Sequence, residues 1–307
     1  FQGVLYVLPT AFIVVVFFIL PILMVIQISA SDWELLRGNS GINFPDNYGA
    51  IERNSLFWPD SIEACACDIA LLADSWRCGA IGVTIIYRVL GTFGLIGLGL
   101  GLGLIVQESG RWNGWLRTAF LLPVALGLAS ASLLAWGLYS PAIGPINPIL
   151  QMLGITSIEA PWSFFGTTLA ALMSTTLLIV WKFAGLYMLI LLVGLQAIPD
   201  EVMEAAAIDG AGRWQAFRRV TLPLLRPALA LCLILAITGS LLAFDQFFIL
   251  TKGGPDNSTV TVVQLIYRES FLRLDLGTAA ALSIIVLLAL LAFNTIQFKG
   301  LRVGRAS

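Results

Sequence analysis

Histidine is absent from this chain of 307 residues, and charged side chains make up only 11% of it. The absence of histidine removes the commonest general base and a frequent metal ligand. Soluble globular domains carry about 25% charged residues, so the scarcity of charge argues against a soluble protein. With a formal net charge of −1, the chain has no basic surface of the kind that nucleic acid requires.

Hydrophobic residues, in contrast, make up 58% of the chain, and the mean hydropathy is +0.91. A helix crosses a bilayer with about 20 apolar residues, and backbone groups in lipid must bond within their own segment. The sequence therefore predicts an all-α membrane protein with one transmembrane domain over 1–307. Six spans are expected, at about 4–30, 80–106, 118–139, 166–195, 224–250 and 276–298.

Glycine recurs through the second predicted span, at 94, 97, 99, 101 and 103. Small residues four apart on a membrane helix allow two backbones to approach closely. We therefore expect Gly97 and Gly101 to form a contact face for another helix. The alternative is that these glycines only reflect the general frequency of glycine in membrane helices.

Basic residues are distributed unequally between the two sides of the predicted bundle. The loops on the side of the termini hold nine in 52 positions, and the loops on the other side hold six in 100. Cytoplasmic loops of membrane proteins are enriched in lysine and arginine. We therefore expect both termini, and the long loop at 196–223, in the cytoplasm.

A charged stretch, EAAAIDGAGRWQAFRRVTLP (204–223), separates the fourth and fifth predicted spans. Proline followed by two acids at 199–201 favours a helix start, and two glycines after Asp209 allow a sharp turn. The sequence predicts a helix–turn–helix elbow, with a first helix ending near Ile208 and a second at about 213–221. An amphipathic loop lying on the membrane surface is the alternative.

The same stretch resembles the EAA signature of the permease subunits of bacterial ATP-binding-cassette (ABC) importers. The E-A-A, D-G-A and L-P elements of that signature stand at 204–206, 209–211 and 222–223. Most of the chain resembles the maltose, oligosaccharide and glycerol-phosphate type of carbohydrate permease. The segments that carry this further likeness are 32–38, 44–51, 181–201 and 244–271.

The resemblance implies a type I ABC importer permease fold, with the elbow at 201–221 as a coupling helix. It also implies a second homologous permease subunit, two ATP-binding subunits and an external substrate-binding protein, in a bacterial plasma (inner) membrane. The chain lacks G-x-x-x-x-G-K-[ST], so we expect no enzyme activity or cofactor here, and ATP and Mg on the partner ATPase. The expected ATPase-coupling residues are Glu204, Ala205, Ala206, Asp209, Gly210 and Arg213.

The substrate site is expected among the polar and aromatic side chains at membrane depth, where polar groups are costly and often functional. In maltose-type permeases, residues of the fourth and fifth spans contact the sugar. Aromatic rings stack on the apolar faces of sugars, while carboxylates and amides bind hydroxyl groups. The expected substrate-binding residues are Tyr187, Ala184, Ser240, Phe244, Asp245 and Gln246.

Two basic residues within the spans, Arg88 and Lys182, leave alternatives open. Either could pair with Asp245 and hold helices together, since structural ion pairs also occur in bundles. Either could instead bind a phosphate. The resemblance therefore implies a di- or oligosaccharide as substrate, with glycerol-3-phosphate or a related polyol phosphate as the alternative.

An insertion at 59–79 departs from the family pattern and brings Cys65, Cys67 and Cys78. A disulfide to Cys78 would suit an oxidising outer compartment, and contact with the binding protein is another role for this segment. A C-x-C pair lacks the spacing of a structural zinc site. Cys232, within the fifth predicted span, is expected to be a packing residue.

Two other classes of protein fit the sequence less well. A secondary transporter also has many spans, but it predicts inverted repeats, and the elbow would then have no role. A membrane enzyme needs a catalytic constellation, and the sequence has neither a paired metal-ligand cluster nor a nucleophile motif. The importer permease is therefore the favoured interpretation.

Overall fold

A computed structural model of the chain describes residues 2–52, 54, 57, 79–108, 110–157 and 161–302. Four helical segments in this part are long and apolar enough to cross a membrane, or up to six if each bent pair is one span. The predicted all-α membrane fold is confirmed. The predicted insertion at 59–79, with its three cysteines, lies outside the described residues except for its last position.

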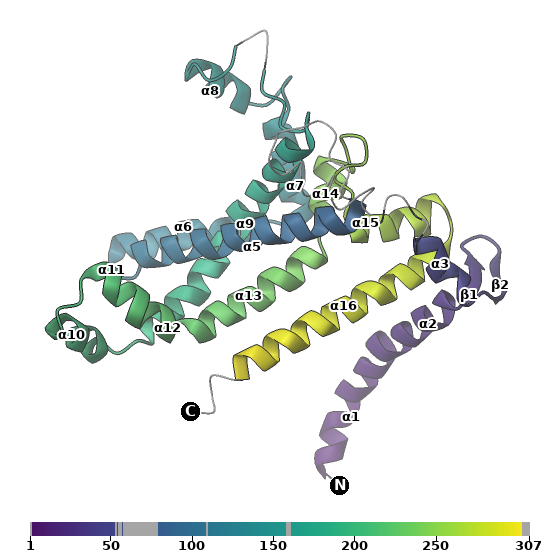
Figure 1. Cartoon of the computed structure of the whole chain (residues 1–307), viewed down its shortest axis with the longest axis horizontal. Coiled ribbons are helices and arrows are strands. Elements are labelled where there is room, and N and C mark those ends of the chain that lie inside the picture. Colours follow the sequence, from purple (N-terminus) through teal and green to yellow (C-terminus); the bar gives the residue numbers. More distant parts are fainter. Residues whose placement is uncertain are drawn as a thin grey trace.

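The N-terminal helix leans away from the other helices (Figure 1). It runs through α1 (Gln2–Val14), a π-helical segment η1 (Val15–Ile19) and α2 (Leu20–Ser29). No residue in the most apolar window of Val7–Ser29 is buried among the described residues, and α2 packs against α16 (Leu276–Arg302). A helix that is hydrophobic on all sides belongs in lipid or against another subunit.

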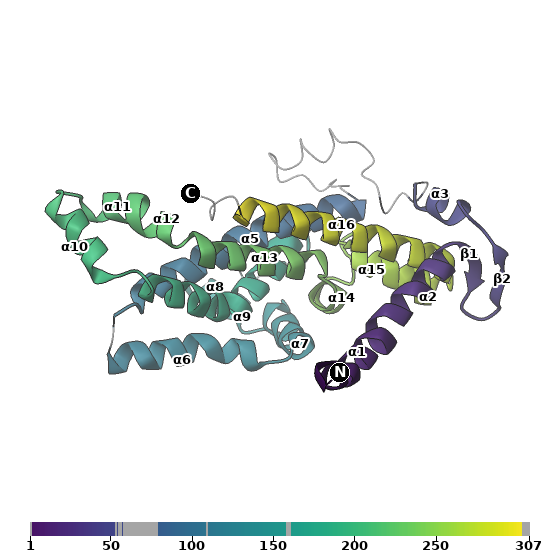
Figure 2. The same cartoon turned by 90° about the horizontal axis from the view of Figure 1, so that it is seen from below.

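A small antiparallel hairpin follows α2, formed by β1 (Ser31–Glu34) and β2 (Gly38–Ile42), and then α3 (Asp46–Glu52). The side-chain amide of Asn47 donates to the carbonyl oxygens of Ser29 and Ser31, both at 2.9 Å. These bonds fix the direction in which the chain leaves α2. The hairpin and α3 lie at the opposite end of the molecule from α10 (Asp200–Ile208), α11 (Arg213–Ala216) and α12 (Leu222–Leu224) (Figure 2).

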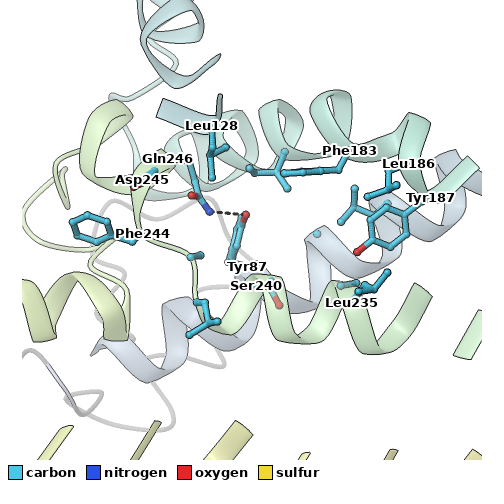
Figure 3. Close-up of a pocket in the computed structure, with 17 residues that line it drawn as sticks. Tyr87, Leu128, Phe183, Leu186, Tyr187, Leu235, Ser240, Phe244, Asp245 and Gln246 are labelled. Atoms are coloured by element: carbon cyan, nitrogen blue, oxygen red, sulfur yellow. Dashed lines mark hydrogen bonds between the residues drawn. The ribbon is translucent and has the colours of Figure 1, made fainter. Parts of the chain in front are cut away.

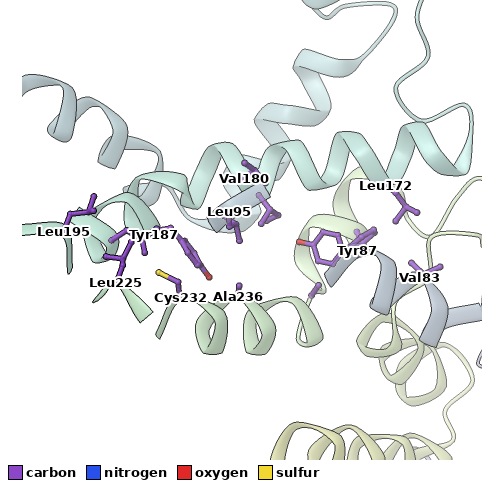
Figure 4. Packing of buried hydrophobic residues seen from close by; sticks show 14 residues of the cluster. Val83, Tyr87, Leu95, Leu172, Val180, Tyr187, Leu195, Leu225, Cys232 and Ala236 are labelled. Carbon is purple, nitrogen blue, oxygen red and sulfur yellow. The ribbon is translucent and has the colours of Figure 1, made fainter. Parts of the chain in front are cut away.

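The centre of the bundle is the packing of α5 (Gly79–Ile105) against α9 (Thr168–Gln196). A Cβ atom added to Gly99 would lie 2.8 Å from Cβ of Tyr187, and one added to Gly94 would lie 2.6 Å from Cγ2 of Val180. Glycine is thus what lets the two backbones approach. Side chains of α5, α9 and α13 (Arg226–Leu241) form the core around this contact (Figure 4).

The predicted contact face at Gly97 and Gly101 is wrong within the described part of the chain, because a Cβ atom added at either position would meet no described atom within 4 Å. The close contacts fall on Gly99 and, more loosely, on Gly103, where the nearest atoms are 3.7 Å away. The two glycines of each pair are four residues apart, whether the pair is Gly97 and Gly101 or Gly99 and Gly103. The two pairs lie on different faces of one helix, and α9 covers only one of these faces.

The predicted third span, at 118–139, is not one straight helix. It consists of α6 (Arg111–Ala125) and α7 (Leu128–Tyr139), which meet at 96°. Proline at 123 cannot donate a helical hydrogen bond, and Leu126 is extended, with ψ of 140°. The hydrophobic run continues across this break, so hydropathy alone does not reveal it.

The predicted fifth span, at 224–250, is also interrupted. Its main part is α13, which ends at Leu241, and after residues 242–244 the chain forms α14 (Asp245–Leu250). The segment beyond α14 contains α15 (Val262–Tyr267) and a π-helical segment η3 (Arg268–Leu272), which lead into α16. The short helix α8 (Ile146–Met152) follows α7 and lies away from the bundle (Figure 1).

Arg268 closes the loop between α14 and α15. Its guanidinium donates to Oδ1 of Asn257 at 2.7 Å and to the carbonyl oxygen of Lys252 at 3.0 Å. Burial, and then the nearby positive charge of Arg273, lower the pKa of Arg268. This loop therefore has a defined conformation at the end of the molecule that carries the hairpin (Figures 1 and 2).

Candidate functional site

A cavity of about 450 Å³ lies between α5, α9, α13 and α14, with one residue from α7 (Figure 3). The break between α13 and α14 opens it, because residues 242–244 leave the helix and form part of the wall. The lining is largely apolar, with a few polar groups that converge, as in many ligand sites. The lining residues are Tyr87, Gly91, Leu95, Leu128, Ile179, Phe183, Leu186, Tyr187, Leu235, Ala236, Gly239, Ser240, Leu242, Ala243, Phe244, Asp245 and Gln246.

The cavity brings together five of the six residues that the sequence assigned to substrate binding. These residues come from α9 and from the α13–α14 region, which are far apart in the chain. The sixth, Ala184, is 3% exposed and does not line the cavity. The five that do are Tyr187, Ser240, Phe244, Asp245 and Gln246.

Other residues that line the cavity, from α5 and from beside the predicted positions, were not predicted from the sequence. Tyr87 of α5 accepts a hydrogen bond of 3.0 Å from Nε2 of Gln246, and its ring meets that of Phe247 edge-on at 4.8 Å. Phe183 and Leu128 add apolar walls from α9 and α7. The position of Tyr87, a tyrosine within the second predicted span, was the sequence feature that could have indicated a place in the site.

Gln246 is the most constrained polar group of this cavity. The residue is 2% exposed, and its Oε1 atom is buried without a hydrogen-bond partner among the residues that the structure describes. A buried acceptor that lacks a partner costs about 1–3 kcal/mol.

The two basic residues of the spans are engaged elsewhere, so neither expected pairing with Asp245 is present. The ammonium group of Lys182, 2% exposed, donates to the carbonyl oxygens of Pro123, Val124 and Leu126. The guanidinium carbon of Arg88 lies 4.0 Å from the ring centroid of Phe293 on α16, a cation–π contact. Neither residue lines the cavity.

The elbow between α9 and α13 consists of α10 (Asp200–Ile208), α11 (Arg213–Ala216), a π-helical segment η2 (Phe217–Thr221) and α12 (Leu222–Leu224). Its turn is a Schellman motif, in which Ala211 N–H donates to the carbonyl of Ala206 and Gly210 N–H to that of Ala207. Gly210 has a φ of +77°, which only glycine adopts at little cost. These features give the α10 end a fixed shape.

The elbow projects from the end of the bundle and is largely exposed (Figures 1 and 2). Exposed apolar side chains at this end include Ile208, which is 86% exposed, and Trp214, which is 71% exposed. Of the six predicted coupling residues, Ala206 is partly buried and the others are exposed: Glu204, Ala205, Asp209, Gly210 and Arg213. An apolar, small-residue surface with charges around it is suited to contact with a protein.

A chain with this arrangement is a subunit of a membrane transport system: a bundle of membrane helices with an internal cavity and an exposed helical elbow at one end. A family model matches residues 96–298, and this chain belongs to that family, the binding-protein-dependent transport system inner membrane components. The fold is that of ABC transporter permeases. One solved structure, of a bacterial alginate ABC transporter in complex with alginate pentasaccharide-bound periplasmic protein, matches with a TM-score of 0.76.

That match covers 96% of this chain and 93% of the other, at 20% identity. Two relatives are more similar in sequence to this chain than that structure is. The trehalose/maltose transport system permease protein MalF of Thermococcus litoralis is 37% identical over 209 residues, 68% of this chain and 68% of that protein. The sn-glycerol-3-phosphate transport system permease protein UgpA of Yersinia pestis is 34% identical over 235 residues, 75% of this chain and 77% of that protein.

Proposed function

We propose that this chain is one transmembrane half of an ATP-driven importer that moves a di- or oligosaccharide into the cytoplasm. An external binding protein delivers the sugar. A second, homologous permease subunit completes the pathway, and two ATP-binding subunits, which hold ATP and Mg, supply the energy. Glycerol-3-phosphate or a related polyol phosphate is the alternative substrate, because the relatives include permeases for that compound.

One structural relationship carries this proposal: the elbow directly joins α9 and α13, the two helices that supply eight of the 17 residues lining the cavity. Movement of the elbow is therefore transmitted to both walls of the cavity. Each of these connections is short, with three residues between α9 and α10 and one between α12 and α13.

The proposed coupling contact is the exposed surface of α10 and the turn after it. The small side chains of Ala205 and Ala206 fit a groove on the ATPase subunit. The charged side chains beside them fix the register of this contact: Glu204, Asp209 and Arg213. When the ATPase dimer closes, the elbows of the two permeases move together and the cavity turns outward. This is a rigid-body change between two states, biased by contacts that differ between them.

The elbow and the C-terminal end of α16 lie toward the same end of the molecule (Figures 1 and 2). With the ATPase at the elbow, that end is cytoplasmic and the hairpin end faces outward. The enrichment of basic residues in the loops on the elbow's side supports the same orientation.

Mild detergent purification of this chain from its native membrane, followed by mass spectrometry, tests the assembly. We expect a cytosolic ATPase and a second permease of similar size to copurify. ATP hydrolysis by this complex in proteoliposomes should rise when sugar-loaded binding protein is added. A chain that purifies alone in repeated mild conditions would contradict the proposal and favour a secondary transporter.

A further inference from the structure

Arg88 places a positive charge at membrane depth. It stands nine residues after Gly79, where α5 begins, so it lies about 13.5 Å along a helix of 27 residues. Its guanidinium meets the ring of Phe293 on α16, and both helices run from the hairpin end toward the elbow end (Figure 1). Seven residues before Arg88, Ile81 belongs to the same apolar cluster as Ile285, which stands eight residues before Phe293. The side chain of Arg88 therefore stays level with its own turn of α5 and does not extend toward the membrane surface.

The charge of Arg88 lacks a compensating anion. Within the described part of the chain, its guanidinium forms no ion pair and no hydrogen bond, and it is left with the cation–π contact to Phe293 at 4.0 Å. A charged side chain at membrane depth is costly unless it is paired, and one aromatic ring offsets only part of that cost. A guanidinium binds a carboxylate through two parallel N–H donors, so a carboxylate is the group that fits.

The depth of Arg88 restricts the source of that carboxylate. In the proposed assembly, the ATPase subunits and the binding protein lie outside the membrane. Lipid phosphates lie at the surface of a hydrocarbon core about 30 Å thick, and the side chain is not directed toward that surface. Asp245, the acid of the cavity, forms no ion pair with Arg88 in the described structure. A membrane helix of another subunit does reach this depth.

The surface around Arg88 also suits a helix from another subunit. Ile85 and Val89 stand beside Arg88 on α5, and both are exposed, as is Phe293 on α16. Lipid alone would be a favourable environment for these apolar side chains but not for the arginine between the two helices. A membrane helix that carries apolar side chains and one acid satisfies both.

We infer that Arg88 forms an ion pair within the membrane with an aspartate or glutamate on a membrane helix of the second permease subunit. The inference rests on the proposed function, which supplies that subunit. It requires an acid in an otherwise apolar span of the second permease. Removal of one member of a buried ion pair is strongly destabilising, because the other charge is left unpaired, while joint replacement by apolar residues is tolerated.

Photo-crosslinking in the native membrane identifies the partner. Benzoylphenylalanine in place of Ile85, which is exposed one turn before Arg88, is irradiated in the assembled complex, and the linked peptide is identified by mass spectrometry. We expect a peptide from a membrane span of the second permease that contains aspartate or glutamate. Benzoylphenylalanine in place of Ile42, exposed on the hairpin, is the control and should not give this peptide.

Charge variants make the test specific to the ion pair. Arg88→Leu should lower the fraction of the chain that copurifies with the second permease at least tenfold, with the released chain in a single gel-filtration peak. Arg111→Leu, which removes an exposed positive charge at the start of α6, is the control and should leave that fraction unchanged. Leucine in place of the linked acid should act like Arg88→Leu. The two leucine replacements together should restore copurification to within about threefold of the unaltered complex.

Cross-links from position 85 to lipid alone, to this chain alone or to a span without an acid would overturn the inference. Full copurification of Arg88→Leu would overturn it too, as would a double replacement that assembles no better than either single one. The proposed function fails by a different result, the absence of a second permease and of binding-protein-dependent uptake. A complex that contains the second permease and transports, yet gives none of the expected cross-links, is an importer whose subunits do not pair through Arg88.

Discussion

Lys182 on α9 donates a hydrogen bond of 3.2 Å to the carbonyl oxygen of Pro123, close to the end of α6. The same ammonium group bonds to the carbonyl oxygens of Val124 and Leu126, where the third predicted span breaks. A cation at the C-terminal end of a helix also interacts favourably with the helix dipole. This contact holds the break against α9, and Leu128, which follows it, lines the cavity.

Lys182→Met should therefore destabilise the protein. The substitution keeps a long apolar stem but leaves three carbonyl oxygens at the break without this donor. The carbonyl of Pro123 also accepts from the N–H of Leu126, and Leu126 is 38% exposed. A buried polar group left without a partner costs about 1–3 kcal/mol, so we expect a loss of that size. Thermal unfolding of the detergent-solubilised protein, followed by tryptophan fluorescence, measures the change.

Lys299→Met provides the control for the loss of one positive charge, since Lys299 is exposed near the end of α16. Its unfolding temperature should match that of the unaltered protein. Lys182→Arg should recover part of the loss, because a guanidinium also donates to carbonyl oxygens. Equal unfolding temperatures for Lys182→Met and Lys299→Met would show that the carbonyl contacts do not stabilise the break.

A pair of glycine substitutions tests the packing of α5 on α9. Gly99→Ala should destabilise by about 1–3 kcal/mol, because the new methyl group would stand 2.8 Å from Cβ of Tyr187 and 3.1 Å from the backbone nitrogen of Met188. In Gly101→Ala the new methyl group meets no atom of the described residues within 4 Å, so the substitution should be neutral or slightly stabilising through helix propensity. Thermal unfolding of the solubilised single chain compares the two. Equal effects would contradict the described interface.

Gly210→Pro should uncouple transport from ATP hydrolysis. Proline fixes φ near −65°, while this position has a φ of +77°, and proline also removes the N–H that donates to Ala207. We expect uptake in proteoliposomes to fall at least tenfold, with the membrane helices still inserted. Asp209→Arg should act in the same direction by reversing the charge at the turn.

Gly212→Ala is the matched control for the elbow, because its φ of −66° suits any residue and an added Cβ meets no atom within 4 Å. Its uptake should stay within about twofold of the unaltered transporter. Normal stimulation of ATP hydrolysis by sugar-loaded binding protein in Gly210→Pro would remove the coupling role from the elbow.

Single cysteines test the orientation. Ile208, on the elbow, is 86% exposed, and Ile42, on the hairpin, is 91% exposed, so a cysteine at either position is accessible to a reagent. In a background with the native cysteines replaced by serine, a membrane-impermeant maleimide added to intact cells should label Ile42→Cys alone. Labelling of Ile208→Cys should require permeabilised cells. The reverse pattern would invert the assigned sides.

Much of the candidate site was predictable from sequence, because its polar residues stand out in an apolar chain. Tyr187, Asp245 and Gln246 were found in this way, and the cavity brings them together. Ala184 was assigned by position alone, and it is buried outside the cavity. Tyr87 was missed because its partner, Gln246, lies 159 residues away in the chain, and no local pattern indicates that contact.

A helical chain that lies in a membrane follows from the amino-acid sequence, because apolar runs of that length are stable only as helices in lipid. The start and turn of the elbow follow from it too, because proline, acids and glycine there act on their immediate neighbours. Which glycines of α5 face α9, in contrast, depends on helix packing. Two glycine pairs have equal spacing, Gly97 with Gly101 and Gly99 with Gly103. The pair that contacts α9 is set by the rotation of α5 about its own axis when the two helices pack.

The break between α6 and α7 was decided in the same way. Proline at 123 weakens the helix locally, and carbonyl oxygens at the end of α6 accept hydrogen bonds from a lysine 59 residues further along the chain. A hydrophobic pattern predicts how far each segment can extend through lipid. It does not predict which distant side chain stabilises a broken helix, because that contact forms only when the helices pack together.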